Sequence, residues 1–149
     1  MSNNETFSKI LVAIDGSEIS LKAADYGIKL ARKDKAQLIV LHVIHIPAAG
    51  LMYTTESAFK QFIDKSTNEA DGWFDKIRKK ASESKVELKA QTIEEMYSVP
   101  GAIIKYCEKM NADIIIVGGT GKSGFKKFLL GSVATDVVRY ARCPVLVIK

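Results

Sequence analysis

Short apolar segments of strand length alternate with amphipathic segments of helix length, and this alternation restricts the fold more than any other feature. Residues 9–15, 37–44, 86–92, 113–117 and 144–148 are typical of strands. Apolar residues recur at helical spacing in 19–32, 59–81, 100–110 and 133–140. Such a chain forms a parallel sheet covered by helices on both faces. We predict one doubly wound α/β domain over residues 1–149, with residues 1–8 flexible and residues 45–56 a loop.

Composition narrows the class of protein. Hydrophobic residues make up 47% of the 149 residues, which is enough to fill one core. No apolar run reaches the length of a transmembrane helix, and the polar first residues lack the apolar core of a signal peptide. Cys107 and Cys143 form no CxxC pair. We therefore expect reduced thiols, a cytoplasmic location and no membrane association.

The charge is distributed unevenly along the chain. Residues 1–74 carry 8 Lys or Arg against 9 Asp or Glu, whereas residues 75–149 carry 14 against 8. A basic half is compatible with binding of nucleic acid or phosphate. However, Lys76, Arg78, Lys79 and Lys80 fall on one predicted helix, where solvated side chains explain them. Basic residues do not alternate with aromatic ones, so we expect no specific nucleic-acid binding.

Two unusual turns follow predicted strands. Asp15-Gly16-Ser17 follows the first strand, and Gly118-Gly119-Thr120-Gly121 follows the fourth. Ligands of doubly wound sheets bind beyond the carboxyl ends of the strands, where the winding direction reverses. If the first and fourth strands are neighbours, both turns face one crevice. Asp15 then either contacts a ligand or accepts a hydrogen bond from the Ser17 backbone.

The glycine-rich turn points to an anion. Gly118, Gly121 and Gly124 permit positive φ and a close backbone approach, and Gly131-Ser132 follows nine residues after Gly121 at the start of the last helix. A helix N-terminus suits a phosphate. The alternative is a plain glycine turn followed by a serine cap. A P-loop is excluded, because Ile116 stands where that motif needs glycine.

The spacing Gly118-x-x-Gly121, nine residues, then Gly131-Ser132 resembles the signature of the universal stress protein family, in its nucleotide-binding branch. The segments ILVAIDGSE, FKKFLLGSVA and CPVLVIK are also similar to family sequences, so the resemblance covers nearly the whole chain. It implies a five-stranded parallel sheet in the order 3-2-1-4-5. In that order the first and fourth strands are neighbours.

The resemblance also implies a ligand and the residues that hold it. The ligand is ATP, with AMP or ADP as weaker alternatives, and Mg²⁺ would bind through the phosphates. Ala13 and Val117 would flank the adenine, Val43 would offer backbone groups to its edge, and Asp15 would accept from the ribose hydroxyls. The phosphates would be held by Gly118, Gly121, Gly131, Ser132 and Val133. Thr120 departs from the Arg or His that relatives often carry, which removes a charge contact.

Three functions fit these observations. The first is a nucleotide-dependent stress regulator with an unknown protein partner and at most slow hydrolysis, since no general base is expected near the phosphates. The second is a small enzyme that transfers nucleotidyl or phosphoryl groups. The third is an interaction module that binds no nucleotide. We also expect an antiparallel homodimer through the last strand, residues 145–148, because an open apolar edge strand favours pairing with another strand.

Overall fold

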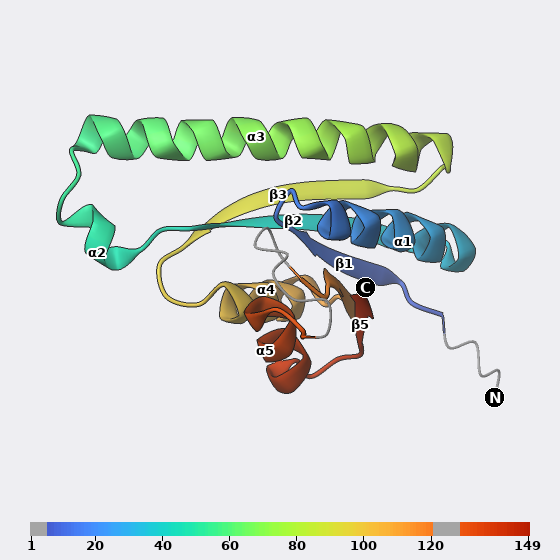
Figure 1. The fold of residues 1–149 in the computed structure, drawn as a ribbon. Coiled ribbons are helices and arrows are strands. Elements are labelled where there is room, and N and C mark those ends of the chain that lie inside the picture. The colour runs from blue at the N-terminus through green and yellow to red at the C-terminus, as the bar shows by residue number, and fades with distance from the viewer. Residues whose placement is uncertain (1–5, 121–128) are drawn as a thin grey trace.

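The computed structural model describes residues 6–120 and 129–149, and within them strands alternate with helices as the sequence predicts (Figure 1). The strands are β1 Lys9–Ile14, β2 Gln37–His45, β3 Leu88–Glu95, β4 Ile114–Gly118 and β5 Val145–Ile148. The helices are α1 Glu18–Asp34, α2 Ala48–Leu51, α3 Glu56–Glu83, α4 Val99–Met110 and α5 Ser132–Tyr140.

The five strands form one parallel sheet in the order β3-β2-β1-β4-β5. This confirms the predicted fold class and strand order. β1 lies at the centre, and Ile10 pairs in register with Leu38 of β2 and with Ile114 of β4. The winding direction reverses between β1 and β4, so the turns that follow these two strands lie beside each other. β3 and β5 are the edges.

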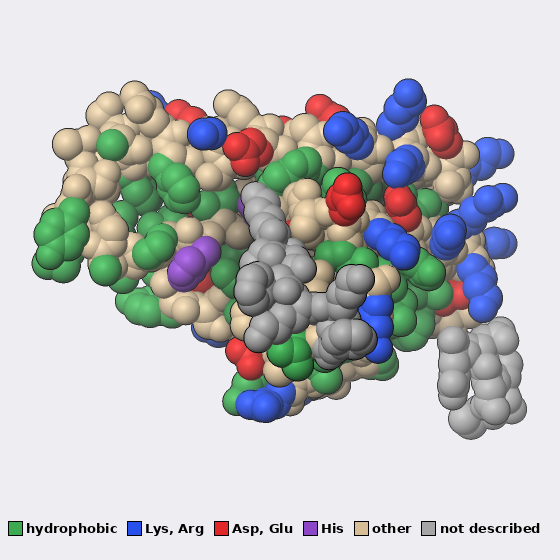
Figure 2. Space-filling view, viewed as in Figure 1, with side chains coloured by type: hydrophobic (Ala, Val, Ile, Leu, Met, Phe, Trp, Pro, Cys, Tyr) green, Lys and Arg blue, Asp and Glu red, His purple; other side chains and the backbone are tan. Residues whose placement is uncertain are grey.

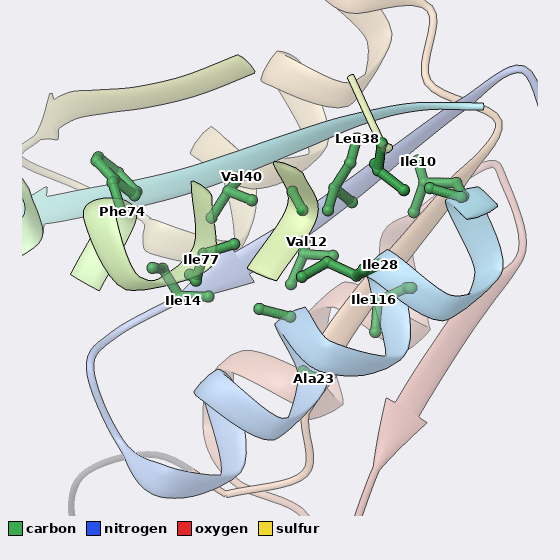
Figure 3. Packing of buried hydrophobic residues seen from close by; sticks show 14 of the residues in the cluster. Ile10, Val12, Ile14, Ala23, Ile28, Leu38, Val40, Phe74, Ile77 and Ile116 are labelled. Carbon is green, nitrogen blue, oxygen red and sulfur yellow. The ribbon is translucent and has the colours of Figure 1, made fainter. Parts of the chain in front are cut away.

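The sheet separates two hydrophobic cores, because successive side chains of a strand point to opposite faces. Ile10 and Val12 of β1 point toward α1 and α3, where they share one core with Phe74 and Ile77 of α3 (Figure 3). Leu11 faces the other side, where it packs with Ile103 of α4 and Val137 of α5. Figure 1 shows the same division, with α1 and α3 on one side of the sheet and α4 and α5 on the other.

Two local predictions differ from the structure. The region predicted as a loop over 45–56 contains α2, and His45 is the last residue of β2 rather than a loop residue. β3 begins and ends later than predicted. Its start is later because Val86 belongs to the turn before the strand, directly after Lys85 in the left-handed conformation. Because β3 is an edge strand, its last residues, Glu94 and Glu95, can be polar. The sequence pattern therefore did not identify them as part of a strand.

Hydrophobic and basic side chains lie at opposite ends of one face of the molecule. Figure 2 shows hydrophobic side chains gathered at the α2 end of this face and Lys and Arg side chains at the opposite end. Met52 and Tyr53, after α2, are 80% and 89% exposed, and Phe62 in the first half of α3 is 45% exposed. In the second half of α3, Phe74 and Ile77 are buried. Among the described residues, no helix combines the length and apolarity needed to cross a membrane.

Candidate functional site

A cavity of about 250 Å³ lies at the carboxyl ends of β1 and β4, where the sheet reverses its winding direction. Such reversal points are the usual ligand sites of doubly wound sheets. Three strands (β1, β2 and β4) and three helices (α1, α4 and α5) contribute residues in addition to the two turns. The described lining residues are Ala13, Ile14, Asp15, Ser20, Val43, Val99, Ile103, Val117, Gly118, Thr120, Gly131, Ser132, Val133 and Ala134.

One side of the cavity is apolar. Ala13 and Val117 come from the two central strands, Val43 comes from β2, and Val99 and Ile103 come from the start of α4. All five side chains are aliphatic, and Val117 and Ile103 are buried. A flat, largely apolar group such as a purine base fits such a wall.

The start of α4 is held in place at this wall by side-chain caps. The Ser98 hydroxyl accepts from the Gly101 amide at 3.0 Å, and Glu95 Oε1 accepts from the amides of Tyr97 at 3.0 Å and Ser98 at 3.3 Å. These two bonds from backbone amides lower the pKa of the Glu95 carboxyl. The turn before α4 therefore satisfies its own amides.

The β1 turn, residues 15–20, forms the polar corner next to this wall. Ser17 caps α1 by accepting from the Ser20 amide at 3.3 Å, and the Ser20 hydroxyl accepts from the Asp15 amide at 3.2 Å. Asp15 Oδ1 accepts from the Ser17 amide at 2.9 Å. The turn role considered for Asp15 is thus present. A carboxylate has about four acceptor positions, so this bond does not exclude ligand contacts.

Gly16 is required in the β1 turn for two reasons. Its φ is +84°, in the region that favours glycine, and an added Cβ would lie 2.1 Å from the Trp73 ring. Trp73 of α3 also packs edge-on against His42, with ring centroids 5.1 Å apart, and His42 Nδ1 lies 2.8 Å from the Ile14 carbonyl oxygen. The long helix α3 therefore supports the turn that carries Asp15.

The glycine rim, defined as residues 118–120 and 131–134, also contributes to the lining of the cavity. Two backbone bonds hold it: the Gly119 amide donates to the Ile148 oxygen at 2.7 Å, and the Gly131 amide donates to the Gly119 oxygen at 2.6 Å. The second bond brings the end of β4 and the start of α5 together. Two segments that are about a dozen residues apart in sequence therefore form one surface.

The structure requires glycine at position 118 for a different reason from the one that the sequence suggested. Positive φ is found at Gly16 among the described glycines and not at Gly118. An added Cβ at Gly118 would lie 2.9 Å from Ile19 Cγ2 and 3.3 Å from the Ser20 nitrogen. Glycine at this position therefore allows the first turn of α1 to approach the end of β4. The expectation of positive φ was wrong here, while the close approach of another backbone is present.

The N-terminus of α5 differs from those of the three other long helices. Ser17, Thr55 and Ser98 cap α1, α3 and α4 with side-chain oxygens, whereas Gly131 caps α5 with no side chain. The first turn of α5 also contains no acidic residue. The amides of Ser132, Val133 and Ala134 precede the intrahelical bonding pattern and so have no partner within the helix. These amides, the Ser132 hydroxyl and the helix dipole favour an anion.

The structure brings eight of the nine residues of the sequence prediction around this one cavity. The ninth, Gly121, lies outside the described residues, as do Gly124 and the basic residues Lys122, Lys126 and Lys127. The predicted site residues did not include the lining residues Ile14, Ser20, Val99, Ile103, Thr120 and Ala134. Periodicity identified Ile103 as an inward-facing residue of its helix, but not what it faces. Among the described residues, no group of three or more His, Cys, Asp or Glu side chains could hold a metal ion.

Comparisons with known proteins identify the family of this chain. The model of the universal stress protein family matches residues 6–149. The chain is 35% identical to the universal stress protein MJ0531 of Methanocaldococcus jannaschii, covering 96% of this chain and 82% of that protein. It is also 35% identical to the universal stress protein YxiE of Bacillus subtilis, covering 96% and 99%. The chain belongs to the universal stress protein family.

Solved structures share the architecture. The structure of the protein MJ0577 has a TM-score of 0.83 and 29% identity, covering 97% of this chain and 96% of that one. A universal stress protein from Archaeoglobus fulgidus in complex with dAMP has a TM-score of 0.68 and 24% identity, covering 95% and 98%. Another in complex with cAMP has a TM-score of 0.73 and 20% identity, covering 97% and 98%. At these identities, the last two establish the shared fold.

Proposed function

We propose that this protein binds an adenine nucleotide, ATP in the first place, and acts as a nucleotide-dependent regulator of the stress response in the cytoplasm. The observation that carries the proposal is the uncapped N-terminus of α5, which borders the same cavity as Asp15. Amides that have no partner within their helix, a carboxylate and an aliphatic wall around one cavity match the phosphates, ribose and base of a nucleotide. The complexes of fold neighbours with dAMP and cAMP identify adenine nucleotides as the class to test.

The described residues fit each part of such a ligand. Ala13 and Val117 would flank the adenine, and Val43 would offer backbone groups to its edge. Asp15 would accept from the ribose hydroxyls, because a carboxylate can accept from both members of a diol. The amides of the glycine rim and the Ser132 hydroxyl would donate to the phosphates. The phosphate-binding residues would be Gly118, Gly121, Gly131, Ser132 and Val133.

The same chemistry favours binding over rapid turnover. Asp15 would lie at the ribose, and the described residues that line the phosphate side are glycines, hydroxyl-bearing residues and aliphatic residues. None of these is a strong general base at neutral pH. Mg²⁺ would be held by the phosphates and water. ATP hydrolysis would therefore be slow, and AMP or ADP would occupy the same cavity with fewer phosphate contacts.

The test compares ligands that differ only in their phosphates. Purified protein is denatured and the supernatant is chromatographed for adenine nucleotides, and calorimetric titrations then use ATP, ADP, AMP and adenosine. We expect affinity to rise with phosphate number, and ATP to bind about tenfold or more tighter than adenosine, because charged hydrogen bonds add about 1.5–3 kcal/mol. No released nucleotide together with no heat from ATP would refute the proposal.

We further propose that two copies pair antiparallel through β5. Within the described part of the chain this strand is an edge of the sheet and pairs only with β4, and Leu146 within it is 37% exposed. Open backbone groups on an apolar edge strand favour pairing with another strand. Light scattering coupled to size exclusion should give twice the 16.4 kDa of one chain. A mass of one chain at micromolar concentration would contradict the dimer.

The regulatory output would pass to a protein partner that recognises the nucleotide-bound form. Met52 and Tyr53, which follow α2 within the segment 48–55, offer exposed apolar side chains. A ligand can favour one conformation only by its different affinity for the two conformations. Proteolysis of the 48–55 segment with and without ATP would test this link, and we expect slower cleavage with ATP.

A further inference from the structure

Cys107 and Cys143 lie side by side at the end of the sheet opposite the cavity. Cys107 is in the last two turns of α4, and Cys143 lies between α5 and β5. Their sulfur atoms are 3.7 Å apart and both are free thiols. A disulfide bond is about 2.0 Å long, so the sulfurs need to approach by roughly 1.7 Å to form one. The sequence predicts reduced thiols but does not indicate this proximity, because the two cysteines are 36 positions apart in the chain.

A second cleft gives a small molecule access to this pair. Its volume is about 270 Å³, and it is lined by both cysteines together with Glu108, Asn111 and Arg142. Cys143 is half-buried at this cleft, whereas Cys107 is only 4% exposed. A small oxidant entering the cleft therefore reaches Cys143 first.

The two thiols have different chemical environments. Burial raises the pKa of Cys107 to about 12, and the neighbouring Cys143 adds to this shift. Cys107 is therefore a protonated thiol at neutral pH, and it also lies 3.6 Å from the Ala112 oxygen, to which it donates. A buried, protonated thiol is a poor first target for oxidation. The position of Cys107, 3.7 Å from Cys143, puts it within reach of an oxidised Cys143, and it gives up its proton as it attacks.

We propose that Cys107 and Cys143 form a redox modification site, in which hydroperoxides convert the pair into an intramolecular disulfide. Hydrogen peroxide first oxidises the Cys143 thiol to a sulfenic acid and is reduced to water. The Cys107 sulfur then attacks the Cys143 sulfur, a sulfur–sulfur bond forms, and the sulfenic hydroxyl leaves with the Cys107 proton as a second water. The sum consumes one peroxide and two thiols and gives one disulfide and two waters.

The position of the pair gives the modification a structural effect. The 36-residue separation between the cysteines contains β4, the glycine rim and α5. A disulfide would join the two ends of this segment without touching the cavity. Because a cross-link restricts the unfolded chain, the oxidised protein should unfold at a higher temperature than the reduced protein. Any effect on ATP affinity rests on the proposed function, whereas disulfide formation does not.

The experiment treats reduced full-length protein with hydrogen peroxide and counts thiols under denaturing conditions. We expect both thiols to disappear, the intact mass to fall by two hydrogen atoms, a peptide map to link Cys107 to Cys143 within one chain, and dithiothreitol to reverse the change. The melting temperature should rise on oxidation. Gain of oxygen at Cys143 with a free Cys107, or a link between two chains, would overturn the proposal.

Two serine variants separate the roles of the cysteines. In Cys107→Ser, peroxide should add oxygen to Cys143, and the melting temperature should not rise on oxidation. In Cys143→Ser, Cys107 should remain reduced under conditions that fully oxidise the wild type. Rapid oxidation of Cys107 in this variant would contradict the proposed order. Nucleotide titrations of the reduced variants report on the cavity separately, so a failure of the disulfide and a failure of nucleotide binding are distinguishable.

Discussion

The β1 turn and the glycine rim are two equivalent junctions of the fold with opposite hydrogen-bonding arrangements. Each follows a central strand and leads to the N-terminus of a helix beside the same cavity. In the β1 turn, side chains of Asp15, Ser17 and Ser20 accept from the turn's own amides. In the glycine rim, two backbone bonds set the geometry, and the first amides of α5 have no side-chain cap.

This difference shows how one architecture separates stability from binding. A junction that satisfies its own amides folds without help, and the Trp73 ring against Gly16 adds packing to it. A junction without a cap leaves its amides available to a bound anion, at some cost to the stability of the helix. Substitution of Gly16 in the first junction should therefore affect mainly folding, and substitution of Gly131 in the second should affect mainly phosphate binding.

The largest effect is expected for Gly16→Ala. The new side chain would adopt a φ of +84° and would collide with the Trp73 ring. The left-handed conformation costs about 1–2 kcal/mol for a residue with a Cβ, and overpacking adds about 1–3 kcal/mol. Urea denaturation should show a loss of about 2–5 kcal/mol in the free energy of unfolding.

Gly72→Ala is the matched control for this substitution. Gly72 lies within α3, and an added Cβ there meets no atom within 4 Å. Alanine favours the helix by about 1 kcal/mol over glycine, so this variant should be more stable than the wild type. Equal stability of the two variants would show that Trp73 moves aside and that the β1 turn is not held by packing.

The second-largest effect is expected for Gly131→Asp, which makes the glycine rim resemble the β1 turn. The φ of −63° at Gly131 suits any residue, so the carboxylate can cap α5. The helix should gain about 1 kcal/mol, while ATP loses amide donors and meets a like charge, weakening its affinity on the order of 100-fold. Adenosine affinity, measured by the same titration, should not change.

Gly131→Ser separates the two causes. Its hydroxyl can cap the same amides without adding a charge, so the loss of ATP affinity should be smaller than for the aspartate variant. If both variants bind ATP as the wild type does, the α5 N-terminus does not contact the phosphates.

A smaller and less selective effect is expected for Asp15→Asn. The amide oxygen can still accept from the Ser17 amide, so the β1 turn is retained. The ribose would lose an ionised acceptor, and affinity for adenosine and ATP should fall together by about tenfold, the equivalent of roughly 1.4 kcal/mol. A loss restricted to ATP would place Asp15 at the phosphates instead.

Patterns within single segments of the sequence predicted the elements and the two turns, while contacts between distant segments required the structure. Apolar spacing identified five strands, and the resemblance supplied their order. Pro47 and Gly50 suggested a loop, which concealed the single turn of α2. The contact of Trp73 with Gly16 joins α3 to the β1 turn, and helical spacing alone shows only that Trp73 lies near an inward face. For the same reason, Val99 and Ile103 were not recognised as part of the cavity.

The smallest effect concerns a third junction, the turn between β3 and α4, which resembles the β1 turn in using its own carboxylate. Bonds from the Tyr97 and Ser98 amides lower the pKa of Glu95 in the folded protein. A lowered folded pKa stabilises the protein above the ordinary glutamate pKa of about 4.3, and this contribution is lost as pH falls through the folded pKa. Glu95→Gln should therefore remove a small part of the acid sensitivity of unfolding below that pH. Glu94→Gln, on the same strand and exposed, is the control, and identical pH profiles for the two variants would show that the Glu95 bonds do not stabilise the fold.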